Sequence, residues 1–183
     1  MEMVVYSRCS ATGCNALVSD EMENVLNKGN NMEYIKATKK DAEKIYDLVQ
    51  ATIRTVYPKY YPKEVVDFFC EHHSFEKITA DIEDGLVGVL FCDDKMVGTG
   101  CYRDNHITRV YVAPEFQGKG YGSYIMQCLE NQIGTEYDSV YLDASLPAAH
   151  LYEKLGYKTI KHDKWPVDKG AVLVYEVMEK HFT

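Results

Sequence analysis

Residues 117–122 read QGKGYG and place three glycines within six positions. The loop follows a stretch of β-like alternation and precedes apolar residues at helical spacing, so it should join a strand to the start of a helix. Backbone N–H groups in the first turn of a helix lack partners within the helix, and glycine lets a ligand approach them closely. Together with the helix dipole and the charge of Lys119, they favour a phosphate. One glycine would suffice for a tight turn, so three indicate a phosphorylated cofactor.

Two common glycine motifs do not fit this loop. The dinucleotide-binding fingerprint G-x-G-x-x-G requires a glycine where this chain has Ser123, and it opens a βαβ unit rather than following antiparallel strands. The P-loop requires a hydroxyl residue after its Gly-Lys pair, where this chain has Gly120. A nucleotide-binding domain of either type is therefore disfavoured.

The segments before the loop predict a strand, a helical region and three more strands. Residues 33–37 alternate like a short strand, and a capping box of Thr38 and Asp41 opens a helical region that extends to residue 84. The period then changes to two in three stretches that we expect to pair as hairpins: LVGVLFCDD, KMVGTGCYRD and HITRVYVAP.

The segments after the loop predict a helix that ends near Gly134, a strand over SVYLDAS, a short helix over LPAAHLYEKLG and two final strands, YKTIKHD and AVLVYEVMEK. Residues 1–31 lack such periodicity and end in the turn-like sequence NKGNN. We therefore expect an N-terminal extension over residues 1–31 and one domain over residues 32–183.

The composition narrows the function classes. A net charge of −8 and a pI near 5.2 argue against a nucleic-acid-binding protein, which would carry a basic face. The six cysteines form no C-x-x-C pair and no zinc-like cluster with histidine, so we predict no metal site. No apolar run approaches the length of a membrane span, and residues 1–31 contain no basic region followed by an apolar stretch, which a leader peptide would show. A cytoplasmic protein without a membrane partner is the simplest expectation.

The residues Gln117-x-x-Gly120-x-Gly122 match the signature Q/R-x-x-G-x-G/A. With the approach V-x-P-x-x-Q-G-K-G-Y-G at residues 112–122 and LYEKLGY at 151–157, the chain resembles the GNAT superfamily of acyl-CoA-dependent N-acetyltransferases from about Met32 to its C-terminus. The resemblance implies an α/β fold with a mixed central sheet of about seven strands flanked by about four helices.

The resemblance also implies how acetyl-CoA binds. Its pyrophosphate would lie on the backbone N–H groups of the loop, and its pantetheine arm would pair with the preceding strand. That strand is expected to carry a bulge near residues 110–112 and to separate from the strand SVYLDAS, leaving a gap for the thioester. The residues assigned to acetyl-CoA on this basis are Val110, Tyr111, Val112, Gln117, Gly118, Lys119, Gly120, Tyr121, Gly122 and Ser145.

Ser145 stands where the family often has asparagine. Its hydroxyl can make one hydrogen bond to the pantetheine arm, or it can cap the following helix; the sequence leaves both readings open.

Tyr152 matches the tyrosine that such enzymes place near the sulfur of coenzyme A. Amine attack on a thioester expels a thiolate, and a neutral phenol with an ordinary pKa of about 10 can give it a proton. The resemblance therefore implies that Tyr152 is the general acid. Without the resemblance, a packed aromatic between Leu151 and Leu155 would be the preferred reading.

The general base is not assigned by the sequence. His106 begins a strand that could face the acceptor, and Asp143 lies on the strand across the expected gap. His72 and His73 lie in the helical region that shapes acceptor binding in related enzymes, together with Tyr60 and Tyr61. Each of these side chains also has a purely structural reading.

The leading functional hypothesis is transfer of an acetyl group from acetyl-CoA to a primary amine of a small molecule, by direct attack. One alternative is a protein or peptide acetyltransferase that acts on an N-terminus or a lysine, with an open groove along residues 41–84. Another is a non-catalytic acyl-CoA-binding module. A homodimer is a further expectation, because many relatives form one.

Overall fold

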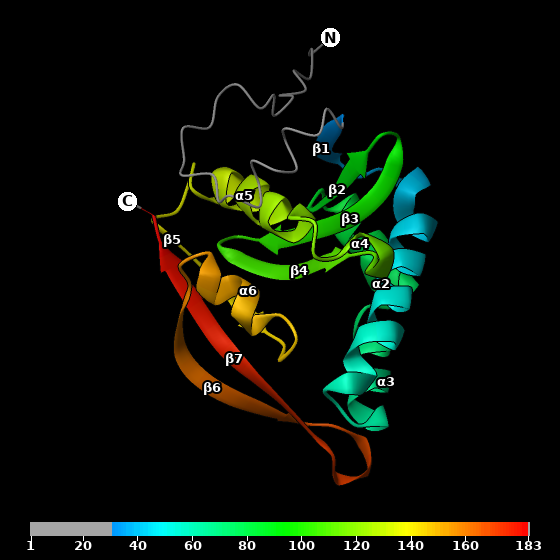
Figure 1. The fold of residues 1–183 in the computed structure, drawn as a ribbon, viewed down its shortest axis with the longest axis vertical. Coiled ribbons are helices and arrows are strands. Elements are labelled where there is room, and N and C mark those ends of the chain that lie inside the picture. Colours follow the sequence, from blue (N-terminus) through cyan, green and yellow to red (C-terminus); the bar gives the residue numbers. More distant parts are fainter. Residues whose placement is uncertain (1–30, 183) are drawn as a thin grey trace.

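The computed structural model describes residues 31–182, which form a seven-stranded sheet with the order β1-β2-β3-β4-β5-β7-β6 (Figure 1). The pairing of β4 with β5 is parallel and the other pairings are antiparallel. The strands are β1 (Met32–Lys36), β2 (Val87–Cys92), β3 (Lys95–Arg103), β4 (His106–Val112), β5 (Ser139–Ala144), β6 (Lys158–Pro166) and β7 (Val172–His181). The expected fold class is confirmed. The predicted extension lies outside the described residues except for Asn31.

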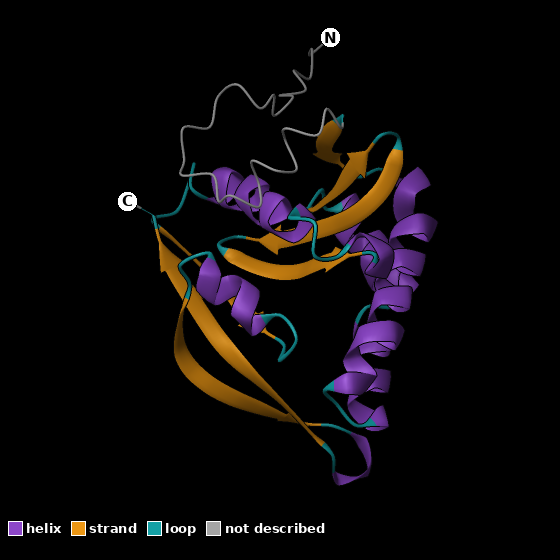
Figure 2. Ribbon diagram, viewed as in Figure 1, coloured by secondary structure: helices purple, strands orange, loops and turns teal. Residues whose placement is uncertain are grey.

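The helices begin and end largely where the sequence indicates. They are α2 (Ala42–Val56), α3 (Lys63–His72), α4 (Phe75–Glu83), α5 (Tyr121–Ile133) and α6 (Ala149–Lys154), so the helical region before β2 holds three of them. Thr38 and Asp41 form the predicted capping box before α2, and the Ser74 hydroxyl accepts a hydrogen bond from the backbone N–H of Lys77 at the start of α4. Figure 2 shows α5 and α6 in front of the strands in this view.

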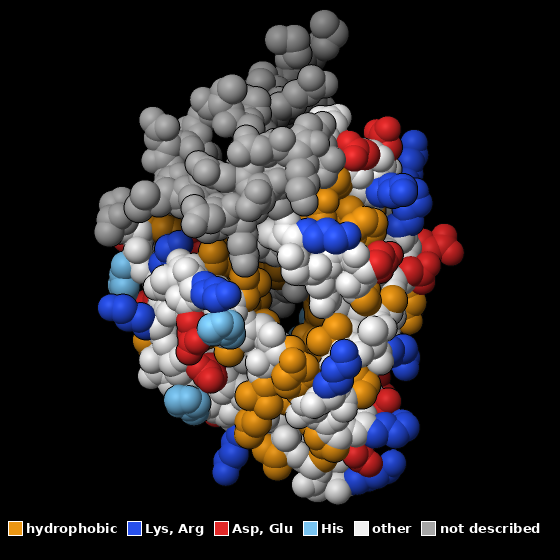
Figure 3. Space-filling model, in the orientation of Figure 1, with side chains coloured by type: hydrophobic (Ala, Val, Ile, Leu, Met, Phe, Trp, Pro, Cys, Tyr) orange, Lys and Arg blue, Asp and Glu red, His pale blue; other side chains and the backbone are white. Residues whose placement is uncertain are grey.

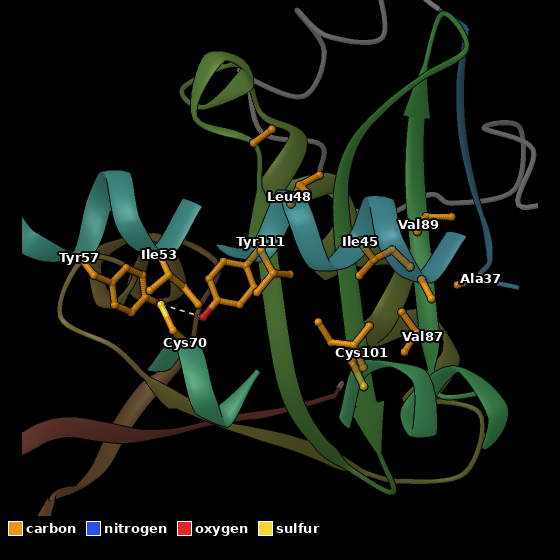
Figure 4. Close-up of a cluster of buried hydrophobic side chains, with 14 of the residues drawn as sticks. Ala37, Ile45, Leu48, Ile53, Tyr57, Cys70, Val87, Val89, Cys101 and Tyr111 are labelled. Carbon is orange, nitrogen blue, oxygen red and sulfur yellow. Dashed lines mark hydrogen bonds between the residues drawn. The ribbon is translucent and has the colours of Figure 1, made fainter. Parts of the chain in front are cut away.

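Two apolar cores lie on opposite faces of the sheet. Ile125 and Leu129 of α5 are fully buried in one core. Ile45 and Ile53 of α2 are fully buried in the other, together with residues of α3 and α4 (Figure 4). Each such side chain contributes roughly 1.5–3 kcal/mol by leaving water. The loop at the start of α5 is therefore held against the sheet by a packed helix.

A glycine of β3 makes the close packing of α5 feasible. A Cβ atom at Gly98 would lie 2.7 Å from Cδ1 of Ile125 and 2.8 Å from the backbone oxygen of Tyr111. Any larger residue would push α5 or β4 away, so Gly98 helps to set the distance between the helix and the strand that leads into the loop.

Strands β4 and β5 pair over only two positions, His106 with Tyr141 and Ile107 with Leu142, and then separate. The register between β3 and β4 shifts so that Thr108 is the extra residue between Ile107 and Arg109. A bulge is therefore present in the expected strand but at Thr108, while residues 110–112 pair regularly with β3. In the part of the chain that the structure describes, the backbone of β4 beyond Ile107 has no strand partner on the side of β5, because the added residue bends the strand at this point.

Three other expectations concern the described residues. Cys92, Cys101 and Cys128 are free and buried, as small apolar residues would be. Within residues 31–182, no group of three or more metal-ligating side chains gathers at one point. No helix in this same range combines the length and apolar character needed to cross a bilayer.

Candidate active site

The glycine loop enters α5 through two residues with positive φ. Gly118 has φ +71° and Gly120, which precedes the first residue of α5, has φ +84°. Residues with a Cβ atom rarely adopt these values, which accounts for two of the three glycines. The third is not required by space, because a Cβ atom on Gly122 would lie 3.4 Å from Cδ2 of Leu151 in α6, an ordinary van der Waals contact.

The space above the loop is open to a ligand. A Cβ atom built on Gly118 would meet no atom of residues 31–182 within 4 Å. Because α5 begins at Tyr121, its first backbone N–H groups have no acceptor within the helix. These N–H groups and the positive end of the helix dipole both point toward the glycine loop. These features fit the phosphates of coenzyme A, which backbone N–H groups at 120–123 would hold.

Two side chains of the loop, Gln117 and Lys119, donate hydrogen bonds to the backbone that precedes the loop. The amide of Gln117 donates a hydrogen bond to the backbone oxygen of Val112 (3.0 Å). The Lys119 ammonium donates to the backbone oxygen of Glu115 (3.0 Å) and lies 5.1 Å from the centre of the Phe116 ring. Lys119 thus holds the turn that precedes α5.

A cavity of about 310 Å³, here called the loop cavity, lies between α2, β4, the loop and α6. Figure 3 shows a hollow with hydrophobic side chains around it in the middle of the molecular face. Of the predicted site residues, all but Lys119 line this cavity: Val110, Tyr111, Val112, Gln117, Gly118, Gly120, Tyr121, Gly122, Ser145 and Tyr152. The hydroxyl of Tyr121 instead points into the core, 3.2 Å from the thiol of Cys92.

Tyr152 lies on α6 with only 7% of its surface exposed. Burial raises the pKa of its hydroxyl well above the ordinary value, and the neighbouring Tyr57 adds to the effect. The side chain is therefore a neutral phenol at neutral pH. It can donate a proton to a thiolate but cannot serve as a base.

Tyr57, at the end of α2, forms a hydroxyl network that the sequence did not indicate. Its hydroxyl lies 3.2 Å from the hydroxyl of Tyr111 and 3.2 Å from Oγ of Ser145, within hydrogen-bond distance of both (Figure 4 labels the two tyrosines). Burial raises the pKa of both tyrosines. The network links β4 to the end of β5 at the point where the two strands have separated.

Ser145 caps the next helix with its backbone rather than its side chain. Its carbonyl oxygen accepts hydrogen bonds from the N–H groups of Ala148 (2.9 Å) and Ala149 (3.1 Å), while its hydroxyl faces Tyr57. A cap made by the Ser145 side chain is therefore ruled out, and its hydroxyl lines the loop cavity.

A second cavity, of about 380 Å³, lies on the α3 side of the sheet and is here called the aromatic cavity. Its defining residues are Phe68, Phe69, His106, Asp143, Trp165 and Tyr175. A narrow space of about 70 Å³, here called the passage, runs along the separation of β4 and β5 and is lined by residues of both cavities. Ser145 lines all three spaces, and Tyr152 lines the loop cavity and the passage.

The four candidate bases, His72, His73, His106 and Asp143, all line the aromatic cavity. Nε2 of His106 lies 3.4 Å from Oδ2 of Asp143, and its ring stacks on Tyr141 with centroids 4.3 Å apart. His72 and His73 also line the aromatic cavity, and burial lowers the pKa of both, that of His73 most strongly. All four therefore lie at the aromatic cavity rather than at the glycine loop.

The tyrosines before α3 have other roles. Tyr60 is half exposed and lines none of these spaces. The hydroxyl of Tyr61 accepts a hydrogen bond from the N–H of Leu146 (2.7 Å) and donates one to the backbone oxygen of Val174 (3.3 Å). Tyr61 therefore ties α3 to β7 and to the segment before α6.

Comparison with known proteins matches residues 82–159 to the model of an acetyltransferase (GNAT) domain. Curated proteins give no match by sequence. Among solved structures, a GCN5-related N-acetyltransferase from Rhodopseudomonas palustris is similar with a TM-score of 0.76 and 22% identity, over 81% of this chain and 94% of that one.

Two further structures were solved with the coenzyme. PaiA N-acetyltransferase from Thermoplasma acidophilum, in complex with coenzyme A, has a TM-score of 0.65 and 19% identity over 83% of this chain and 99% of its own. YncA, a putative acetyltransferase from Salmonella typhimurium with acetyl-CoA, has a TM-score of 0.65 and 17% identity over 84% and 95%. At these identities the likeness shows a shared fold.

Proposed function

The chain belongs to the GNAT superfamily of acetyl-CoA-dependent acetyltransferases, and from that premise we propose that it transfers the acetyl group directly to a primary amine of a small molecule. The observation that carries this proposal is that the passage shares lining residues with both the loop cavity and the aromatic cavity: Ser145 lines all three spaces, and Tyr152 lines the passage and the loop cavity. A co-substrate and an acceptor entering from opposite faces of the sheet would meet there.

The residues fit coenzyme A on the loop side. The open space at Gly118 and the first N–H groups of α5 suit its phosphates, and the backbone of β4 beyond Ile107, which lacks a strand partner toward β5, suits an extended arm. Bound acetyl-CoA would supply an activated thioester at the passage.

In the proposed reaction, a residue of the chain would supply the proton that the departing sulfur needs. Tyr152, kept neutral by burial, gives its proton to the departing sulfur. Tyr57 and Ser145 hold the end of β5 in place through their hydrogen bond, which fixes the width of the passage. The amine loses its own proton to water before it attacks.

The covered acceptor side favours a small molecule over a peptide. The β6–β7 hairpin reaches α3, where Tyr61 donates to Val174 and Leu173 is buried in the helical core (Figure 1). An extended peptide needs an open groove at this place, which the hairpin covers. A non-catalytic acyl-CoA module is disfavoured by the position of a buried, neutral tyrosine in the passage.

The proposal is tested by coenzyme A release from acetyl-CoA with two sets of acceptors, small primary amines and peptides that carry a free N-terminus or a lysine. We expect turnover with members of the first set and none above background with the second. Turnover with peptides alone would replace the proposal by the protein-acetyltransferase alternative. Binding of acetyl-CoA without turnover in either set would favour the non-catalytic module.

A further inference from the structure

Four aromatic side chains of residues 31–182 line the aromatic cavity. Its rings come from α3 (Phe68, Phe69) and from the β6–β7 hairpin (Trp165, Tyr175). Trp165 is the only tryptophan of the chain, and 56% of its surface is exposed. Aromatic side chains gathered around one concave space are typical of a small-molecule site.

One carboxylate lies in this lining. Asp143 follows Leu142, the last residue of β5 that pairs with β4, so it stands where the two strands separate and the passage begins. Its side chain is 47% exposed, with Oδ2 3.4 Å from His106. Asp143 lines both the aromatic cavity and the passage, so a cation between the two spaces would lie close to its carboxylate.

The other titratable groups near the cavity are mostly buried or already paired. His106 contacts Asp143 itself, and Asp163, opposite Tyr175 on the hairpin, is paired with Lys161 at 2.5 Å. Burial lowers the pKa of His72 and His73, so both are neutral at neutral pH. The nearest guanidinium, that of Arg109, is buried and paired with Asp81 at 2.6 Å. Among residues 31–182, Asp143 is thus the carboxylate that lines this cavity.

From this arrangement we infer that the acceptor is a primary amine carried on an aromatic or bulky apolar body. Its ammonium group pairs with Asp143 at the mouth of the passage, and its body fills the space between α3 and Trp165. The inference rests on the proposed function and names the substrate class of the same site. A volume of about 380 Å³ lies at the lower end of the range for small-molecule sites.

The same features disfavour a polyamine. Its second ammonium group would lie among Phe68, Phe69 and Trp165 without a carboxylate, and desolvation of an unpaired charge is strongly unfavourable. An aromatic body gains from burial against these rings instead.

The transfer balances with the groups present. The ammonium gives one proton to water, and the amine nitrogen then bonds to the acyl carbon as the carbon–sulfur bond breaks. The sulfur takes the proton of Tyr152, and Tyr152 regains a proton from the amide nitrogen through water. Each turnover thus converts ammonium and thioester into amide, thiol and one released proton.

The test compares 2-phenylethylamine, n-butylamine and spermidine as acceptors for the full-length protein at saturating acetyl-CoA. We expect kcat/KM for 2-phenylethylamine to exceed that for n-butylamine at least about tenfold, with spermidine no better than n-butylamine. Equal use of the three amines, or a preference for spermidine, would overturn the inference but leave the proposed function standing. Absence of both acetyl-CoA binding and acetylation would overturn the proposed function itself, and this inference with it.

Two variants separate the parts of the inference. Trp165→Ala should bring the ratio of kcat/KM for 2-phenylethylamine over n-butylamine close to one. Because more than half of the surface of Trp165 is exposed, we expect this replacement to leave the fold intact. Asp143→Asn should raise KM for both amines about tenfold and leave the Kd for acetyl-CoA unchanged.

The matched control is Asp47→Asn, which removes an equal charge from an exposed position on α2 outside the cavities. It should leave every constant unchanged. If Asp143→Asn behaves like this control, Asp143 does not recognise the amine. If Trp165→Ala leaves the ratio of kcat/KM values unchanged, the inference that the acceptor has an aromatic body is wrong.

Discussion

Tyr152 owes its suitability as a proton donor to its surroundings. The side chain is 7% exposed, and burial holds the pKa of its hydroxyl well above the value of about 10 for a tyrosine in water. The phenol therefore remains protonated throughout the neutral range, and loss of activity through its ionisation should occur only above pH of about 10.

Replacing Tyr152 by phenylalanine should remove this proton donor and preserve the packing of the ring. We expect kcat to fall by roughly 10²-fold or more, the usual contribution of a general acid. The Kd for acetyl-CoA, measured by calorimetry, should stay within about twofold, because the phosphates bind elsewhere. Tyr60→Phe, on the surface, is the control. A kcat equal to that of the unmodified protein would exclude Tyr152 as the acid.

The sequence could indicate which side chains gather at the loop cavity where they carry a motif of their own, but not where tertiary packing brings them there. The residues of the loop and Tyr152 are recognisable because their spacing repeats a known pattern. Tyr57 reaches the site from 88 positions before Ser145, and no local feature marks it among the fifteen tyrosines of the chain.

At the scale of elements, the loop and α5 act as one unit. The positive φ values of Gly118 and Gly120 turn the chain into the helix, and the packing of α5 on β3 at Gly98 fixes where its N-terminus points. The glycines of the loop and the apolar spacing of the helix are local features of the sequence, so the sequence predicts both the helix and its start.

A pair of substitutions at Gly118 separates the charge of the loop from its shape. Asparagine and aspartate are similar in size and both tolerate positive φ, and the position has open space. We expect Gly118→Asp to weaken acetyl-CoA binding at least about tenfold more than Gly118→Asn, because a carboxylate repels the phosphates. The difference should shrink at high salt. Equal Kd values for the two variants would contradict the placement of the phosphates on this loop.

Features that depend on contacts between distant segments could not be predicted from the sequence. The strand before the loop was expected to carry its bulge near Val110, but the extra residue is Thr108, because the bulge depends on how β3 and β4 pair. The aromatic cavity joins α3 to the β6–β7 hairpin, which lie about 100 residues apart in the chain. Local periodicity carries no information about such contacts.

For the whole molecule, buried tyrosines link stability to pH. Burial raises the pKa of four tyrosine hydroxyls that are almost fully enclosed, those of Tyr34, Tyr57, Tyr111 and Tyr152. Above pH of about 10 the unfolded chain loses protons that these hydroxyls retain in the folded state. The free energy of unfolding should therefore be unaffected by these groups below that pH and should fall as the pH rises above it.

Tyr34 offers the simplest test of this dependence. Its hydroxyl is buried and finds no hydrogen-bond partner within the part of the chain that the structure describes. Tyr34→Phe should therefore leave the free energy of unfolding at pH 7 unchanged or raise it by about 1 kcal/mol. It should also make the decline above pH of about 10 shallower. Urea unfolding at both pH values measures this, and a steeper decline than in the unmodified protein would refute the assignment.

The binding of acetyl-CoA to the intact chain tests the account most directly. Calorimetric titration of the full-length protein should show one molecule of acetyl-CoA bound per chain with micromolar affinity, and Gly118→Asp should bind much more weakly than Gly118→Asn. Absence of binding would contradict the assignment of the glycine loop as a phosphate site, and the roles given to Tyr152 and to the passage would fall with it.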